Sequence, residues 1–138
     1  MSEFECPPLL QQKLVLIIED DAVLLKTLAS WFSSAGCRVM TAPDGRLGLT
    51  HFEQIRPDLV VTDIIMPERE GVETIMAMKA QDRTVPILAI SGGGRVGAGE
   101  FLSLALSLGA DGALAKPFRS RELLTMSANL LGKAAKAA

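Results

Sequence analysis

Residues 14–21 read LVLIIEDD, an uninterrupted apolar run that ends in three acidic residues. Apolar, partly β-branched runs of this length are typical of strands that are buried on both faces. Three more runs have the same form, and a polar residue closes each of them: residues 59–62 before Asp63, 87–90 before Ser91 and 113–115 before Lys116. We therefore expect four strands whose carboxyl ends all carry a polar group.

Segments with helical periodicity lie between these runs. The first begins at residue 22 and places Leu24, Leu25 and Leu28 on one face, and Gly36 supplies its stop. The same patterns predict helices over residues 45–54, 70–80, 100–108 and 120–131, and one further strand over residues 37–42. Strands that alternate with helices form a parallel sheet that is covered on both faces. The expected fold class is therefore α/β, a doubly wound five-stranded parallel sheet.

The length allows one domain. The chain has 138 residues, of which 49% are hydrophobic, which is enough for one substantial core and too little for a second domain. Pro7 and Pro8 lie in a segment without periodicity, so we expect residues 1–12 to form a flexible N-terminal arm and residues 13–131 to form the domain. Residues 132–138, GKAAKAA, are expected to form a frayed C-terminal tail.

Charge and hydropathy exclude several classes of partner. The formal net charge of −2 and the pI near 5.4 provide no general attraction to nucleic acid or to anionic lipid. The apolar stretches are too short to span a bilayer, and the first residues lack the basic and apolar segments of a signal peptide. We therefore expect a cytoplasmic protein without direct nucleic-acid or membrane binding, in which Cys6 and Cys37 are free thiols.

The polar groups that close the strands suit phosphoryl chemistry. Parallel strands share one carboxyl edge, where open α/β sheets bind their ligands. Glu19, Asp20 and Asp63 should meet at that edge, and close carboxylates repel one another unless a cation such as Mg²⁺ neutralises them. Ser91 and Lys116 would add a hydroxyl and a positive charge that suit a phosphoryl group. Phosphoryl transfer depends mainly on such positioning and charge neutralisation, so the set needs no separate general acid or base.

Four motifs in order along the chain resemble the CheY-like receiver domain of two-component response regulators. They are IIEDD at residues 17–21, DIIMP at 63–67 with Gly71, AISG at 89–92 and AKPF at 115–118. Each motif is weakly specific alone, but the four together, at these spacings, are strongly specific. The resemblance covers residues 13–131 and implies the strand order 2-1-3-4-5. It also implies a signalling protein that catalyses only its own aspartyl phosphorylation and dephosphorylation, and is otherwise not an enzyme.

The resemblance assigns roles to the acidic residues. It implies that Asp63 is the phosphoacceptor, that Asp20 is a direct Mg²⁺ ligand, and that Glu19 is an acid that orients metal-bound water. The backbone carbonyl of Ile65, two residues after the acceptor, would complete the metal site.

The resemblance also assigns the phosphoryl contacts and the donor. Ser91 would bind the phosphoryl group through its hydroxyl, and Lys116 would pair with that group. A cis peptide bond between Lys116 and Pro117 is implied as well. The donor would be a phosphohistidine on a sensor histidine kinase or on a histidine phosphotransfer protein.

One departure from the family leaves the route of output open. Receivers usually carry Tyr or Phe three residues before the lysine, and this chain has Ala113 there. The length leads us to expect no output domain, so the signal would leave by contact with a downstream protein target. The expected helix over residues 100–108, EFLSLALSL, is more apolar than one buried face requires. We expect Phe101, Leu104, Ala105 and Leu108 to face the core. Leu102 and Leu106 then either belong to a more deeply packed helix, or are scattered exposed leucines, or form a surface for a partner or a homodimer.

Two other functions remain open. A pseudo-receiver that is never phosphorylated would act only as an interaction module, which is disfavoured because every expected catalytic position is filled. Residues 92–97, GGGRVG, match the pattern GxGxxG, so a flavodoxin-like nucleotide-binding enzyme is a second, less favoured alternative. That pattern belongs after the first strand of a nucleotide-binding fold, whereas here it follows the fourth.

Overall fold

The computed structural model of the protein describes residues 5–64, 70–91 and 98–137, and in these ranges five strands alternate with five α-helices. The strands are β1 (Leu14–Ile18), β2 (Arg38–Ala42), β3 (Leu59–Asp63), β4 (Ile87–Ser91) and β5 (Gly112–Ala115). The helices are α1 (Ala22–Ser34), α2 (Gly45–Ile55), α3 (Glu70–Gln81), α4 (Ala98–Ser107) and α5 (Ser120–Ala137). The predicted alternation of strands and helices is therefore confirmed, with differences of a few residues at element ends.

The strands form one parallel sheet in the order β2-β1-β3-β4-β5, which confirms the expected fold class and topology. Ile18 lies opposite Thr62 across the β1–β3 pair, and Asp63 lies opposite Ile90 across the β3–β4 pair. Because the strands run in one direction, their last residues collect at a single edge of the sheet.

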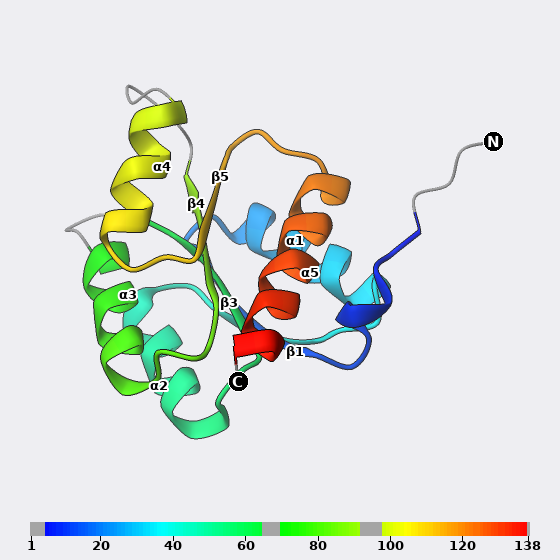
Figure 1. The fold of residues 1–138 in the computed structure, drawn as a ribbon, viewed down its shortest axis with the longest axis horizontal. Helices are drawn as coiled ribbons and strands as arrows, with labels where there is room; N and C mark the ends of the chain where they lie inside the picture. The colour runs from blue at the N-terminus through cyan, green and yellow to red at the C-terminus, as the bar shows by residue number, and fades with distance from the viewer. Residues whose placement is uncertain (1–4, 65–69, 92–97, 138) are drawn as a thin grey trace.

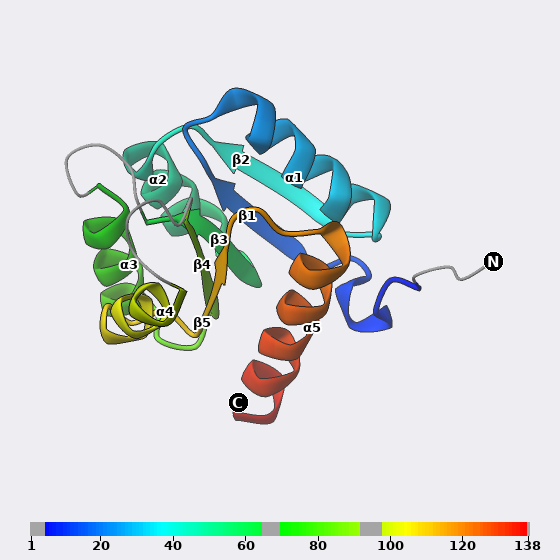
Figure 2. The ribbon, with the colours of Figure 1, turned by 90° about the horizontal axis from the view of Figure 1, so that it is seen from above.

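Helices cover both faces of the sheet. Figures 1 and 2 show α1 and α5 on one face and α2, α3 and α4 on the other. Strand β1 is buried between them, and its side chains alternate between two apolar clusters. Val15 and Ile17 belong to the cluster that contains Leu28 of α1, while Leu16 belongs to the cluster that contains Phe52 of α2. Complete burial of side chains of this size contributes about 2 kcal/mol each.

Side-chain caps and a glycine turn fix the ends of the first two helices. The carboxylate of Asp21 accepts hydrogen bonds from the amides of Val23 and Leu24, so it is the N-cap of α1. Asp44 caps α2 in the same way through the amide of Leu47. Gly36, just after α1, has a φ of 93°, which only glycine adopts without strain. These residues end and start the elements where the sequence indicates.

The segment before β1 contains a short 3-10 helix, Pro8–Leu10, where the sequence indicates a flexible arm. Leu10 is completely buried in the core cluster on the α1 and α5 side. The thiol of Cys37 donates to the carbonyl of Leu10, and burial raises the pKa of this thiol to about 11. Both cysteines are free, as expected. Burial of Leu10 supplies the free energy that opposes the conformational entropy of a free arm.

The last helix continues to Ala137, past its expected end at Leu131. The residues expected to fray are rich in alanine and lysine, which are strong helix formers. Leu130 and Leu131 also anchor this part of α5, because both are buried in the core. In the described part of the chain, no helix has both the length and the apolar character needed to cross a bilayer.

Candidate functional site

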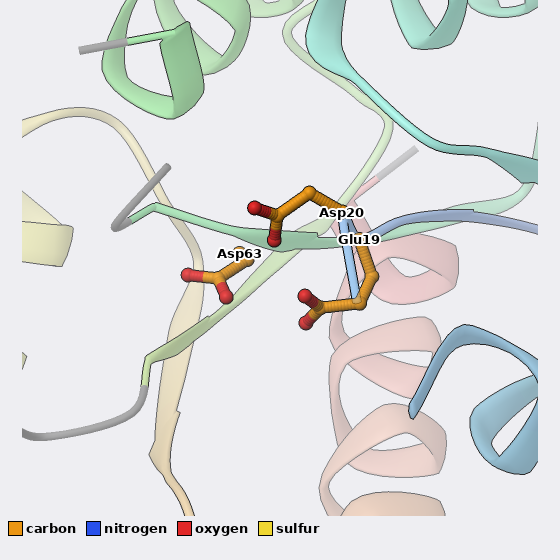
Figure 3. A group of neighbouring side chains, drawn as sticks. All are labelled: Glu19, Asp20 and Asp63. Atoms are coloured by element: carbon orange, nitrogen blue, oxygen red, sulfur yellow. The ribbon is translucent and has the colours of Figure 1, made fainter. Parts of the chain in front are cut away.

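Three carboxylates meet at the carboxyl edge of the sheet. Asp63 is the last residue of β3, and Glu19 and Asp20 directly follow the neighbouring strand β1. Each side chain offers one oxygen, and these oxygens all lie within 4.8 Å of one another. Figure 3 shows the three carboxylates grouped at the ends of the two strands. The structure thus brings together the three acids that the sequence places at strand ends.

The three acids differ in exposure. Glu19 and Asp63 are 1% and 4% exposed, whereas Asp20 is open to solvent. One oxygen of Glu19, Oε2, accepts a hydrogen bond of 3.1 Å from the backbone amide of Asp21. Asp21 therefore supports the site through its amide and caps α1 through its carboxylate. The close spacing of Glu19 and Asp21 in the sequence is the signal that could have indicated this contact between the amide of Asp21 and the carboxylate of Glu19.

Lys116 joins the two buried acids. Its Nζ donates to Oε1 of Glu19 at 2.9 Å and to Oδ2 of Asp63 at 2.8 Å. The lysine follows β5, and its backbone amide donates to the carbonyl of Ser91 at 2.6 Å, which fixes the chain at this point. The Lys116–Pro117 peptide bond is cis, as the resemblance implies. One ammonium is thus shared by two acids, while the third acid, Asp20, stands beside them.

Burial and charge pull the pKa values of this group in opposite directions. Burial raises the pKa of Glu19, and the bond from Lys116 only partly offsets the cost of removing this carboxylate from water. Burial alone would lower the pKa of Lys116, but the hydrogen bonds and charges of Asp63 and Glu19 outweigh it, so the pKa is raised. Lys116 is therefore a permanently charged group at neutral pH.

Ser91 lies at the same edge. It is the last residue of β4, the strand between β3 and β5, and it is completely buried. The sequence predicts this placement. The carbonyl of Ile65, which the resemblance adds to the metal site, lies outside the described residues.

The acids fit a hard divalent cation. All three donors are carboxylate oxygens, and the ion pairs of the described residues bring the single positive charge of Lys116 to this group of acids. Mg²⁺ binds oxygen ligands of this kind and needs only one or two carboxylates. The donor set is thus compatible with the metal that the sequence predicts.

The region expected to carry output is only partly as predicted. Ala113 is buried in the cluster that contains Ala105 of α4, and no aromatic side chain occupies its position. Leu106 is 52% exposed, as expected. Ala105 is completely buried, as expected, whereas Leu104 is 45% exposed, so its expected place in the core is wrong. The side chains of residues 101 and 102 are not among those described.

Comparisons with known proteins agree with this arrangement. Residues 15–128 match the family described as the response regulator receiver domain. The chain is 36% identical over 117 residues to the transcriptional regulatory protein PrrA of Mycobacterium leprae, covering 85% of this chain and 49% of that protein. It is 33% identical over 112 residues to the alkaline phosphatase synthesis transcriptional regulatory protein PhoP of Bacillus subtilis, covering 80% and 45%. The chain therefore spans about half the length of these curated relatives.

A solved structure supports the fold independently. A CheY-like response regulator receiver domain protein from Methanospirillum hungatei superposes with a TM-score of 0.83 at 24% identity, covering 93% of this chain and 100% of that one. The fold and the edge of grouped acids define a receiver-type signalling domain. The chain belongs to the response regulator receiver domain family of two-component systems.

Proposed function

We propose that this receiver accepts a phosphoryl group on Asp63 from a phosphohistidine, with Mg²⁺ required, and passes the signal on through a protein contact that depends on phosphorylation. The observation that carries the proposal is the position of Asp63. Its buried carboxylate lies within reach of two other acids and accepts a hydrogen bond from Lys116.

In the transfer, an oxygen of the Asp63 carboxylate forms a bond to phosphorus as the bond between phosphorus and the donor imidazole breaks. The electron pair of the broken bond stays on the imidazole nitrogen. Lys116 holds its positive charge beside Asp63, where negative charge on the phosphoryl oxygens would otherwise be repelled. The hydroxyl of Ser91 is a donor at the same edge for a phosphoryl oxygen.

Glu19, Asp20 and Asp63 are the residues that would hold Mg²⁺. When bound, the ion neutralises the acids and the phosphoryl oxygens that approach them. Asp20, the exposed acid, is open to an ion that arrives from solvent, whereas Glu19 is held in place by Lys116 and by the amide of Asp21.

The donor partner would be a sensor histidine kinase or a histidine phosphotransfer protein, both of which present phosphohistidine. For output, the exposed Leu104 and Leu106 on α4 support a contact with a downstream protein or a second copy of the chain. A variant with Leu104→Ser and Leu106→Ser is expected to be phosphorylated normally but to lose assembly on phosphorylation, as measured by light scattering. Normal assembly of a folded double variant would place the output surface elsewhere.

The phosphorylation itself is tested by intact-mass measurement after incubation with acetyl phosphate and Mg²⁺. One added phosphate is expected, and Asp63→Asn should abolish it. Asp44→Asn is the matched control, because Asn caps a helix as well as Asp does and Asp44 lies outside the site.

Two results would overturn the proposal. If the wild-type protein gained no phosphate, the chain would be a pseudo-receiver that acts only as an interaction module. If nucleotides stabilised the protein against thermal unfolding while acetyl phosphate left its mass unchanged, the nucleotide-binding alternative would be favoured.

A further inference from the structure

Two adjoining hollows lie where the strands begin, at the opposite edge of the sheet from Asp63. Their volumes are about 330 Å³ and about 230 Å³. Thr84, Pro86 and Ala134 line both hollows, and we call the two together the basal groove. Pro86 directly precedes β4, and Figure 1 shows the C-terminal end of α5 beside the loop that enters β3. The groove is thus separated from the acidic site by the length of the sheet.

Part of the groove is built by residues outside the match to the receiver family. The match to the family ends at residue 128, ahead of the lining residues Leu130, Lys133 and Ala134. These residues belong to the part of α5 that continues to Ala137. Lys13, which lines the smaller hollow, lies before the start of the match. The groove is therefore completed by residues outside the family match, and it lies apart from the phosphorylation site.

The floor of the groove is apolar. Pro86 and Leu130 line the larger hollow, and Val85 and Leu131 line the smaller one. The larger hollow is of the size that small-molecule sites occupy, roughly 300–1,000 Å³.

The rim of the groove carries positive charge without counter-ions. Lys13, Arg83 and Lys133 line it, and among the described residues none of these three side chains forms a hydrogen bond or an ion pair. This local excess is opposite in sign to the net charge of the chain, −2.

The two acids of the lining are already engaged. Oδ2 of Asp111 accepts from Nζ of Lys79 at 2.6 Å and from the amide of Ile87 at 2.8 Å. Oδ2 of Asp58 accepts from the amide of Leu14 at 2.8 Å. Because Lys79 neutralises Asp111, only Asp58 opposes the three unpaired cations. The groove therefore favours an anion that also has an apolar part.

We propose that the basal groove binds a small amphiphilic carboxylate, an anion with a short aliphatic chain. The aliphatic chain of the ligand would lie against Pro86 and Leu130, and its carboxylate would pair with the guanidinium of Arg83 or the ammonium of Lys133. Arginine suits this role because its planar group pairs with both carboxylate oxygens. The ligand and the phosphoryl group bind at opposite edges, so they do not compete for the same residues.

The experiment is a titration of the whole protein with sodium octanoate, kept below its micelle concentration and followed by amide NMR shifts. We expect saturable shifts that are largest at Thr84, Leu130 and Ala134. Lys133→Glu should weaken binding about tenfold, because it replaces an attraction by a repulsion, and Lys133→Gln about threefold. The matched control is Lys136→Glu, the same charge change on the same helix but outside the lining, and it should alter binding less than about twofold.

Three results would overturn the proposal. One is the absence of saturable shifts in the groove. Another is an equal loss on Lys133→Glu and Lys136→Glu, which would mean only general charge attraction. A third is equal binding of octyltrimethylammonium, which has the same chain length but the opposite charge. Asp63→Asn should bind octanoate like wild type, so failure here is distinguishable from failure of the phosphorylation proposal.

Discussion

The two edges of the sheet hold their charges in opposite ways. At the carboxyl edge, Glu19 and Asp63 are buried and share the ammonium of Lys116 at hydrogen-bonding distance. At the edge where the strands begin, Arg83 and Lys133 are exposed and have no ion-pair partner among the described residues.

The difference shows where a charged side chain carries a free-energy cost of burial in this fold. A buried carboxylate loses its water and must be paired, so the carboxyl edge is a tightly coupled group in which a change to one member affects the others. An exposed cation keeps its water, and its removal costs the fold little. Variants of single charged residues at the two edges should therefore differ sharply in effect.

The largest contrast is expected between two lysines. Lys116→Met leaves Glu19 and Asp63 buried without a counter-charge, and it should lower the free energy of unfolding by about 2 kcal/mol, less than for a fully buried pair because Lys116 is partly exposed. The rate of phosphorylation by acetyl phosphate should fall about 100-fold, since a fixed donor at the phosphoryl group is lost. Urea denaturation and timed intact-mass measurements check the two effects.

Lys133→Met, at the other edge, is the matched control. Its exposed side chain should change the free energy of unfolding by less than about 0.5 kcal/mol and leave phosphorylation unchanged. Similar destabilisation by both substitutions would mean that the two edges do not differ as described.

The next effect concerns the acid that Lys116 does not bond. Asp20→Asn removes one of three negative charges that lie close together, so it should stabilise the metal-free protein by about 1 kcal/mol. The same change should reduce the rise in thermal midpoint that Mg²⁺ produces, because a ligand is lost. Thermal unfolding with Mg²⁺ and with a chelator measures both. A lower midpoint without metal together with an unchanged Mg²⁺ response would show that Asp20 is a structural residue.

The carboxyl edge was largely predictable from the sequence, because each strand there ends in a polar residue after an apolar run. Parallel direction alone then places Asp63, Ser91 and Lys116 together. The hydrogen bonds from Lys116 to two acids at once were not predictable, since they depend on side-chain distances across strands far apart in sequence.

The basal groove could not be predicted at all. Its lining comes from the segment before β1, the connections that lead into β3, β4 and β5, and the last turns of α5, and no motif links them. The end of α5 was predicted too early, because alanine and lysine resemble a frayed tail as readily as a helix. The apolar count of residues 100–108 also could not say which side chains turn inward, so Leu104 was assigned to the wrong face.

A smaller effect at the carboxyl edge should depend on pH. The pKa of Glu19 is raised in the folded protein, so its ionised form is the unfavourable one there. This cost is absent below the ordinary glutamate pKa of 4.5 and grows as pH rises from there through the folded pKa. Glu19→Gln removes this cost but also weakens the hydrogen bond from Lys116, which offsets part of the gain. The net result should be a stabilisation of the metal-free protein by about 0.5 kcal/mol at neutral pH. Urea denaturation should show this advantage shrinking below pH 4.5, and an advantage that grows there would contradict the assignment.

An effect of similar size but opposite sign is expected at the other edge. Asp82, just before the basal groove, accepts hydrogen bonds from the hydroxyl and the amide of Thr84 and pairs with Arg56, and these contacts lower its pKa. A lowered pKa means that ionised Asp82 stabilises the fold above its ordinary pKa of 3.8, and that this stability is lost as pH falls through the folded pKa. Because solvent screens the group, Asp82→Asn should destabilise the protein by only about 0.5 kcal/mol at neutral pH. Urea denaturation of both variants should show opposite signs at neutral pH, and a stabilising Asp82→Asn would remove the proposed difference between the edges.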